Sequence, residues 1–232
     1  PSLWGNAPDP HQIHVQADIL DLLPDDVESV LDLGCGDGFV TDALPARLRV
    51  VGVDLSAAAL RHVRRPGAVA VGQFLPFANQ QFDLVMANDV IEHLDDASRA
   101  AVLKEMQRVS RKYVLITVPH DEQIEANCSR CADCGAVYHV HWHHHAFRAD
   151  EVVRLMEPRF KALEIRYSGD LTLAPADPFV PLAQECGIYR SWSESVCPHC
   201  KSPRQQNTPE DSLIVRLIAA RRCEHWYAGQ DM

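Results

Sequence analysis

The sequence is notable first for what it lacks. It has no run of about 18 apolar residues, so we expect no membrane-spanning helix. The first ten residues contain no basic segment followed by an apolar one, so we find no export signal there and expect a cytoplasmic protein. The formal net charge is -10, and this lack of basic excess argues against a protein that grips a phosphate backbone. A local basic patch remains compatible with that charge.

The composition is that of a soluble globular protein. Hydrophobic residues make up 47% of the 232 residues and charged residues 23%, which suits one large α/β domain or one domain with a sizeable insertion. There are 8 cysteines. Four of them form two CxxC pairs, and without an export signal these pairs favour metal binding over a disulfide framework.

Short apolar runs alternate with segments of helical spacing along most of the chain. This alternation predicts a doubly wound, Rossmann-like α/β fold with a mainly parallel, seven-stranded sheet and helices on both faces. The expected strands are residues 30–33, 49–54, 68–71, 82–87, 113–118, 161–167 and 212–219. The expected helices are residues 11–23, a segment from Phe39, residues 57–63 capped by Ser56, and residues 95–109 and 150–156.

Two segments without periodicity interrupt this pattern, and both carry a CxxC pair. We therefore expect two inserts in one core. The predicted parts are a cofactor-binding core (1–125), a Cys/His-rich insert (126–147), a core helix and strand (148–170), a second insert (171–209), and a last core strand with a tail (210–232).

A glycine-rich loop follows the first expected strand. Gly34 and Gly36 lie in the segment 31–38 (LDLGCGDG), where glycines allow a tight turn and close approach of a ligand to the main chain. Asp54 ends the next strand about twenty residues on, where a carboxylate can accept both ribose hydroxyls of a nucleoside. A nicotinamide dinucleotide is the competing ligand, and a tight turn without ligand is the alternative.

Four ordered motifs resemble the class I S-adenosylmethionine-dependent methyltransferases. They are VLDLGCGDG (30–38), VGVDLS (51–56), LPF (75–77) and the pair FDLV (82–85) with VIEHL (90–94), within a resemblance that covers about residues 18–119. It implies S-adenosylmethionine as cofactor, with the methionine part along the glycine loop and the ribose on Asp54. The segment 71–74, which would contact adenine, is shorter than usual in that family. The implied cofactor-binding residues are Asp32, Gly34, Gly36, Asp54, Leu55, Gln73 and Asn88.

Three chemically active side chains follow the fourth expected strand. On a helical turn, Asp89, Glu92 and His93 would share one face, where they could hold a second, divalent cation or provide a general base. A purely structural duty is an equally weighted alternative. The segment resembles the acid-x-x-Glu-His motif of small-RNA 3′-terminal 2′-O-methyltransferases and ubiquinone-pathway O-methyltransferases, and His145-Ala146-Phe147 resembles a His-x-Phe motif of the RNA enzymes. The candidate catalytic residues are His93, Glu92, Asp89 and His145.

The two CxxC pairs predict a structural zinc site. Cys131, Cys134, Cys197 and Cys200 can supply four thiolates to one tetrahedral ion. Cys128 lies one CxxC step before Cys131, so the register is ambiguous, and the neighbouring histidines are alternative ligands. Because both pairs follow expected parallel strands, one zinc would join two loops into a lid over the transferred methyl group.

These observations favour O-methylation of a small-molecule or glycan hydroxyl. A metal-dependent RNA 3′-terminal 2′-O-methyltransferase is one alternative, although the acidic charge disfavours a nucleic-acid acceptor. A non-catalytic zinc-ribbon binding module is the other. The sequence does not indicate an oligomeric state or name the acceptor.

Overall fold

The computed structural model describes residues 4–168 and 195–206, together with residues 180, 183, 184, 187 and 189. The chain divides into two compact units. The first contains residues up to 122 and from 145 to 172, and the second contains residues 123–144 and those from 173 onward, so the predicted 126–147 insert falls largely in the second unit. Each unit is described by itself.

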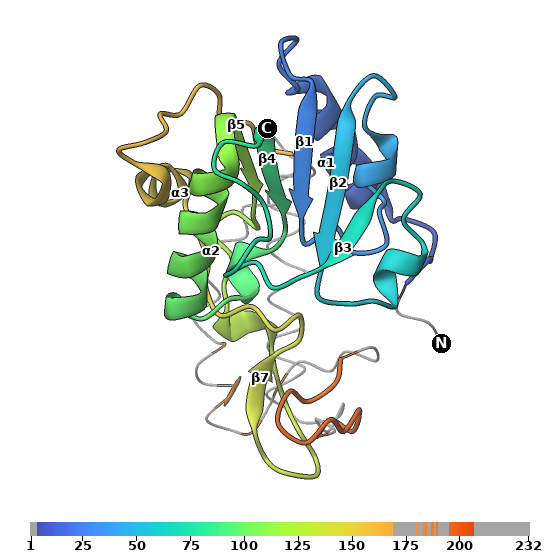
Figure 1. The fold of residues 1–232 in the computed structure, drawn as a ribbon. Coiled ribbons are helices and arrows are strands. Elements are labelled where there is room, and N and C mark those ends of the chain that lie inside the picture. Colours follow the sequence, from blue (N-terminus) through green and yellow to red (C-terminus); the bar gives the residue numbers. More distant parts are fainter. Residues whose placement is uncertain are drawn as a thin grey trace, which may run out of the picture. The chain divides into compact units, whose positions relative to one another are not determined.

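Five parallel strands form the sheet of the first unit, in the order β3-β2-β1-β4-β5 (Figure 1). The strands are β1 (Ser29–Leu33), β2 (Arg49–Asp54), β3 (Gly67–Val69), β4 (Phe82–Asn88) and β5 (Ser110–Thr117). The helices are α1 (Pro10–Asp21), α2 (Asp96–Val109) and α3 (Ala149–Met156), with short 3-10 helices η1 (Thr41–Ala43), η2 (Ala59–Arg61) and η3 (Ile91–His93). The predicted Rossmann-like architecture with a mainly parallel sheet is confirmed for this part of the chain.

Alternate residues of β1, β2, β4 and β5 serve two separate hydrophobic cores. In β4, Val85 and Ala87 pack on one face with buried residues of α2, including Met106. Leu84 and Met86 pack on the opposite face, in the core that contains Ile19 of α1. A strand covered on both faces must be apolar at every position, which explains the continuous apolar runs in the sequence.

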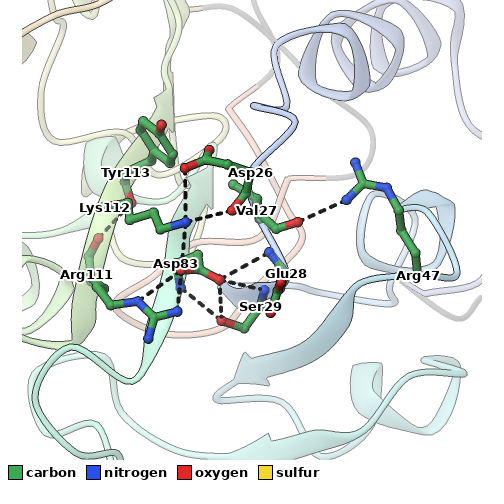
Figure 2. Close-up of polar contacts among 10 residues, drawn as sticks. Asp26, Val27, Glu28, Ser29, Arg47, Asp83, Arg111, Lys112 and Tyr113 are labelled. Atoms are coloured by element: carbon green, nitrogen blue, oxygen red, sulfur yellow. Dashed lines mark hydrogen bonds and ion pairs between the residues drawn. The ribbon is translucent and has the colours of Figure 1, made fainter.

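An ion pair between the buried Asp83 of β4 and the half-exposed Arg111 of β5 links the amino ends of neighbouring strands (Figure 2). Asp83 of β4 is fully buried and accepts hydrogen bonds from the Glu28 and Ser29 N–H groups at 3.1 and 3.2 Å. Its other oxygen accepts from the Arg111 guanidinium at 2.5 and 3.0 Å. Burial alone would raise the pKa of Asp83, but Arg111 and the N–H donors hold that pKa well below its usual range.

Two segments that were expected as helices form only short 3-10 turns. The segment from Phe39 is helical only in η1, and residues 57–63 are helical only in η2. Pro45 and Pro66 follow these turns closely, and proline cannot continue a helix because it has no N–H. The Ser56 hydroxyl accepts the Ala59 N–H at 3.1 Å, but the N-cap of η2 is Ala58, so Ser56 does not cap a helix as predicted.

The structure assigns no strand to residues 161–167, so the sixth predicted strand is not confirmed. This segment has no ladder partner among the described residues, and Leu163, Ile165 and Tyr167 are 81%, 53% and 49% exposed. Alternation of apolar residues predicts a half-buried strand only if a neighbouring strand pairs with it. The last expected strand, residues 212–219, lies outside the described residues, as does the expected 210–232 tail.

Within the described residues, no helix is both long enough and apolar enough to cross a membrane.

Candidate functional site

The glycine loop is built against the ends of two neighbouring strands. The N–H groups of Gly34 and Cys35 both donate to the Val53 carbonyl of β2, at 2.7 and 3.1 Å. Gly34 has φ +73°, and a Cβ there would lie 2.4 Å from a methyl carbon of Val90. Only glycine fits this position, which brings the loop after β1 against the segment after β4.

Asp54 is held rigidly at the end of β2. One carboxylate oxygen accepts the Gly36 N–H at 2.9 Å, and the other accepts the Ser56 N–H at 2.7 Å. A carboxylate fixed by two N–H donors keeps its remaining lone pairs in a defined direction. Such a group can receive a pair of ligand hydroxyls.

A cavity of about 500 Å³ opens at the carboxyl ends of β1, β2 and β4, where parallel sheets bind ligands. Three carboxylates line it, those of Asp37, Asp54 and Asp89. The lining, all of it in the described part of the chain, includes no Lys or Arg side chain. The predicted cofactor residues that line it are Gly34, Gly36, Asp54, Leu55, Gln73 and Asn88.

Asp32, also predicted to bind the cofactor, lies behind the cavity lining. It is 2% exposed and accepts the Thr41 hydroxyl at 2.5 Å. Burial raises the pKa of Asp32 to about 6. Burial, followed by the charges of Asp32 and Asp54, raises the pKa of the adjacent Cys35 thiol to about 12. Cys35 is therefore a packing residue of the loop and a poor nucleophile at neutral pH.

The segment after β4 forms the helical turn that was predicted, as η3. Glu92 is fully buried, and its Oε1 lies 4.0 Å from Nε2 of His93, whose imidazole lines the cavity. Asp89 lines the same cavity but is held by other groups. Its N–H donates to both the carbonyl oxygen and the hydroxyl of Thr117, each at 3.2 Å.

Thr117 was missed by sequence reasoning. It ends β5 and is in register with Asn88 at the end of β4. Its hydroxyl donates to the Asn88 side-chain oxygen at 2.7 Å. The signal that could have found it is a hydroxyl residue at the carboxyl end of the strand next to β4.

His145 lies in a different environment from His93. Its N–H donates to the Glu92 carbonyl at 3.4 Å, while its imidazole faces α2, with Nε2 3.6 Å from Asp96 Oδ1. Its ring centroid is 6.0 Å from that of Phe147. His145 is not among the residues that line the cavity, and a catalytic role shared with His93 stays a prediction.

In the second unit, four thiols converge on one point. The sulfur of Cys131 is 3.5 Å from that of Cys200, and the sulfur of Cys134 is 3.6 Å from that of Cys197. All four sulfurs lie within 4.8 Å of one another, and none forms a disulfide. Zn–S bonds of about 2.3 Å in a tetrahedron place sulfurs about 3.8 Å apart, so the four positions fit a zinc ion.

The two CxxC turns have the same backbone structure. In the first, the Cys131 N–H donates to the Ala136 carbonyl at 2.9 Å, and the Gly135 N–H donates back to the Cys131 carbonyl at 3.1 Å. The turn at Cys197 repeats both bonds at the same spacing, each at 2.9 Å. Gly135 and Lys201, at equivalent places, both have positive φ, +74° and +62°. Each turn therefore aims its two sulfurs in the same way.

The remaining thiol and histidine candidates have other contacts. The Cys128 sulfur lies 3.3 Å from the Ile124 carbonyl oxygen, outside the four-thiol group. Strand β6 (Cys128–Arg130) pairs antiparallel with β7 (Val137–His139). His139 of β7 is buried, and its Nδ1 accepts the N–H groups of His141 and His143, each at 3.3 Å. This ring organises the loop after β7.

Comparisons with known proteins agree with this geometry. A family model described as a methyltransferase domain matches residues 30–113. The malonyl-[acyl-carrier protein] O-methyltransferase of Legionella pneumophila is 40% identical over 91 residues, which cover 34% of this chain and 31% of that protein. A Mycobacterium tuberculosis protein described as a "probable S-adenosylmethionine-dependent methyltransferase" is 29% identical over 163 residues, covering 61% of this chain and 57% of that protein. The chain thus spans less than two thirds of either relative.

Among solved structures, a Thermotoga maritima S-adenosylmethionine-dependent methyltransferase, described as a possible histamine N-methyltransferase, superimposes with a TM-score of 0.50. It is 20% identical, over 62% of this chain and 68% of that one, and this likeness supports the fold alone. The glycine loop and the fixed Asp54 lie within residues 30–113, so this part of the chain is a methyltransferase domain similar to those of S-adenosylmethionine-dependent methyltransferases.

Proposed function

We propose that this protein binds S-adenosylmethionine in the cavity after β1, β2 and β4 and methylates a hydroxyl group of a small molecule or glycan. The observation that carries the proposal is the charge of the cavity, which has three carboxylates in its lining and no Lys or Arg. A dinucleotide carries an anionic pyrophosphate and would meet repulsion there, whereas the sulfonium and ammonium groups of S-adenosylmethionine are cationic. The same charge disfavours an acceptor that brings phosphate groups into the cavity.

In this proposal, Asp54 and the glycine loop bind different parts of the cofactor. Asp54 would accept the ribose hydroxyls, because Gly36 and Ser56 already hold both of its oxygens in place. Gly34 and Gly36 would lie along the methionine part, because both line the cavity and neither has a side chain to exclude it. When bound, S-adenosylmethionine supplies an electrophilic methyl group on its sulfonium.

His93 is the residue suited to accept the proton that the acceptor hydroxyl loses. Its imidazole reaches the cavity, and the buried Glu92 carboxylate lies 4.0 Å away, where it can orient the ring and stabilise its protonated form. An alcohol is a weak nucleophile at neutral pH and needs such a base. A cation held by Asp89 and Glu92 is the alternative means of activation, and it stays a prediction.

Isothermal titration calorimetry tests the cofactor. The wild-type protein should bind S-adenosylmethionine and S-adenosylhomocysteine but not NAD, and Asp54→Ala should weaken both by roughly 10- to 100-fold, since a ligand loses hydrogen bonds to a charged acceptor. Asp25→Ala, at an exposed turn residue, is the matched control. Equal affinity of the wild type and the Asp54 variant, or tight binding of NAD, would contradict the proposal.

We also propose that Cys131, Cys134, Cys197 and Cys200 hold one structural zinc ion. The support is the convergence of the four sulfurs and the repeated backbone structure of the two turns. Bound zinc would join two segments that are far apart in the sequence and so stabilise the second unit directly. That this unit acts as a lid over the transferred methyl group stays a prediction.

A further inference from the structure

We infer that Thr117 is a positioning residue that holds Asp89 toward the cavity, and that the Asp89 carboxylate makes the cavity prefer the cationic cofactor over its neutral, demethylated product. The inference rests on the proposed function, because it concerns the ligand pair of a methyltransferase. The inference gives Asp89 and Thr117 a role in selecting the cofactor, which is separate from the methyl transfer itself.

Asp89 has a backbone conformation that residues other than glycine rarely adopt. Its φ is +51°, in the left-handed region, where a residue with a Cβ is strained unless its surroundings hold it. The bonds that hold it come from Thr117, whose carbonyl oxygen and hydroxyl oxygen each lie 3.2 Å from the Asp89 N–H. Strain that is maintained at the rim of a ligand cavity points to a function for the residue that bears it.

The Thr117 hydroxyl also orders the side chains around Asp89. It has one proton, and that proton goes to Asn88 Oδ1 at 2.7 Å. The Asn88 amide is thereby oriented, with its Nδ2 3.5 Å from Asp89 Oδ2. The second Asp89 oxygen lies 3.4 Å from the same hydroxyl. The Thr117 hydroxyl therefore fixes the Asp89 backbone directly, and it orders the Asp89 carboxylate through the oriented Asn88 amide.

The position of Asp89 in the sheet gives its charge a specific target. Asp54 ends β2 and Asp89 follows β4, and β1 with the glycine loop lies between them. If Asp54 binds the ribose, the other end of the cavity receives the sulfonium end of the cofactor, where Asp89 lies. S-adenosylmethionine carries a positive sulfur, whereas S-adenosylhomocysteine has a neutral thioether, so a nearby carboxylate stabilises only the first. This charge favours exchange of product for fresh cofactor.

The test measures the affinities of S-adenosylmethionine and S-adenosylhomocysteine by calorimetry for the wild type and for Asp89→Asn, Thr117→Val and Thr117→Ser. We expect Asp89→Asn to lower the preference for the sulfonium compound roughly 5- to 20-fold, with little change for the thioether. Thr117→Val should shift the same ratio in the same direction by several-fold. Thr117→Ser, which keeps the hydroxyl, should restore the wild-type ratio, and Asp25→Asn should leave it unchanged.

The outcomes separate this inference from the proposed function. Equal weakening of both compounds by Thr117→Val would show that Thr117 is only structural, and an unchanged ratio in Asp89→Asn would show that the carboxylate does not sense the sulfonium. Either result overturns the inference and leaves the proposed function in place. Wild-type protein that binds neither compound would overturn both. If Thr117→Val does not fold, Asp89→Asn and Thr117→Ser still decide the question.

Discussion

Replacing Asp32 by Asn should stabilise the ligand-free protein at neutral pH. The carboxyl group is 2% exposed, and the hydrogen bond it accepts comes from the neutral hydroxyl of Thr41. Burial disfavours its charged form and raises its pKa to about 6. Asn has nearly the same shape, carries no charge and can still accept the Thr41 hydroxyl proton, so the variant removes the cost of ionisation.

The sign and size of the effect follow from the two pKa values. Unfolded Asp titrates near pH 4, so the folded state binds the Asp32 proton more tightly than the unfolded state. The contribution of this group to stability is complete below about pH 4 and is lost as the pH rises through about 6. A pKa difference of two units corresponds to about 3 kcal/mol, so Asp32→Asn should raise the free energy of unfolding by about 1–3 kcal/mol at pH 7.5.

Urea denaturation at several pH values between 4.5 and 7.5 checks this prediction. The gap in unfolding free energy between Asp32→Asn and wild type should be small at pH 4.5 and widen with pH. Asp25→Asn, at an exposed turn residue, is the control for a generic charge effect. A variant that is less stable than wild type at pH 7.5, or a gap that does not change with pH, would refute the reasoning.

Three further perturbations test other parts of the structure. His93→Ala should lower turnover of the acceptor by roughly 10²- to 10⁴-fold, with unchanged affinity for S-adenosylhomocysteine; near-normal turnover would make His93 structural. Cys197→Ser should release the zinc that elemental analysis is expected to find at about one ion per chain, whereas Cys128→Ser should retain it. Asp83→Asn should cost about 1–3 kcal/mol in urea denaturation at pH 7, because the buried carboxylate that accepts from the half-exposed Arg111 and from two N–H groups is lost. Since the pKa of Asp83 is lowered in the folded state, its contribution is present above about pH 4 and is lost as the pH falls below that, so the gap between variant and wild type should shrink in acid.

The sequence by itself determined the features that are encoded locally. The strands β1, β2 and β4 and the second half of β5 are mainly apolar because both faces of the sheet are covered, and such runs can be recognised without knowing their neighbours. The glycine loop and Asp54 were recognisable because a tight turn between a strand and a helical turn requires particular residues at particular positions. The CxxC pairs were recognisable for the same reason, since each makes its turn within a few residues.

Only the tertiary structure decided the features that depend on partners far apart in the chain. The alternation at residues 161–167 resembles a strand, but without a ladder partner in the described part of the chain it leaves Leu163 exposed. His145 was placed near His93 by analogy of motif, yet its imidazole faces Asp96. Thr117 and Asn88 are 29 positions apart in the sequence, and only the pairing of β4 with β5 brings the Thr117 hydroxyl to the Asn88 side chain. Hydrogen bonds and charge interactions depend on atoms being a few ångströms apart, and the number of residues between two positions does not determine their distance in the folded protein.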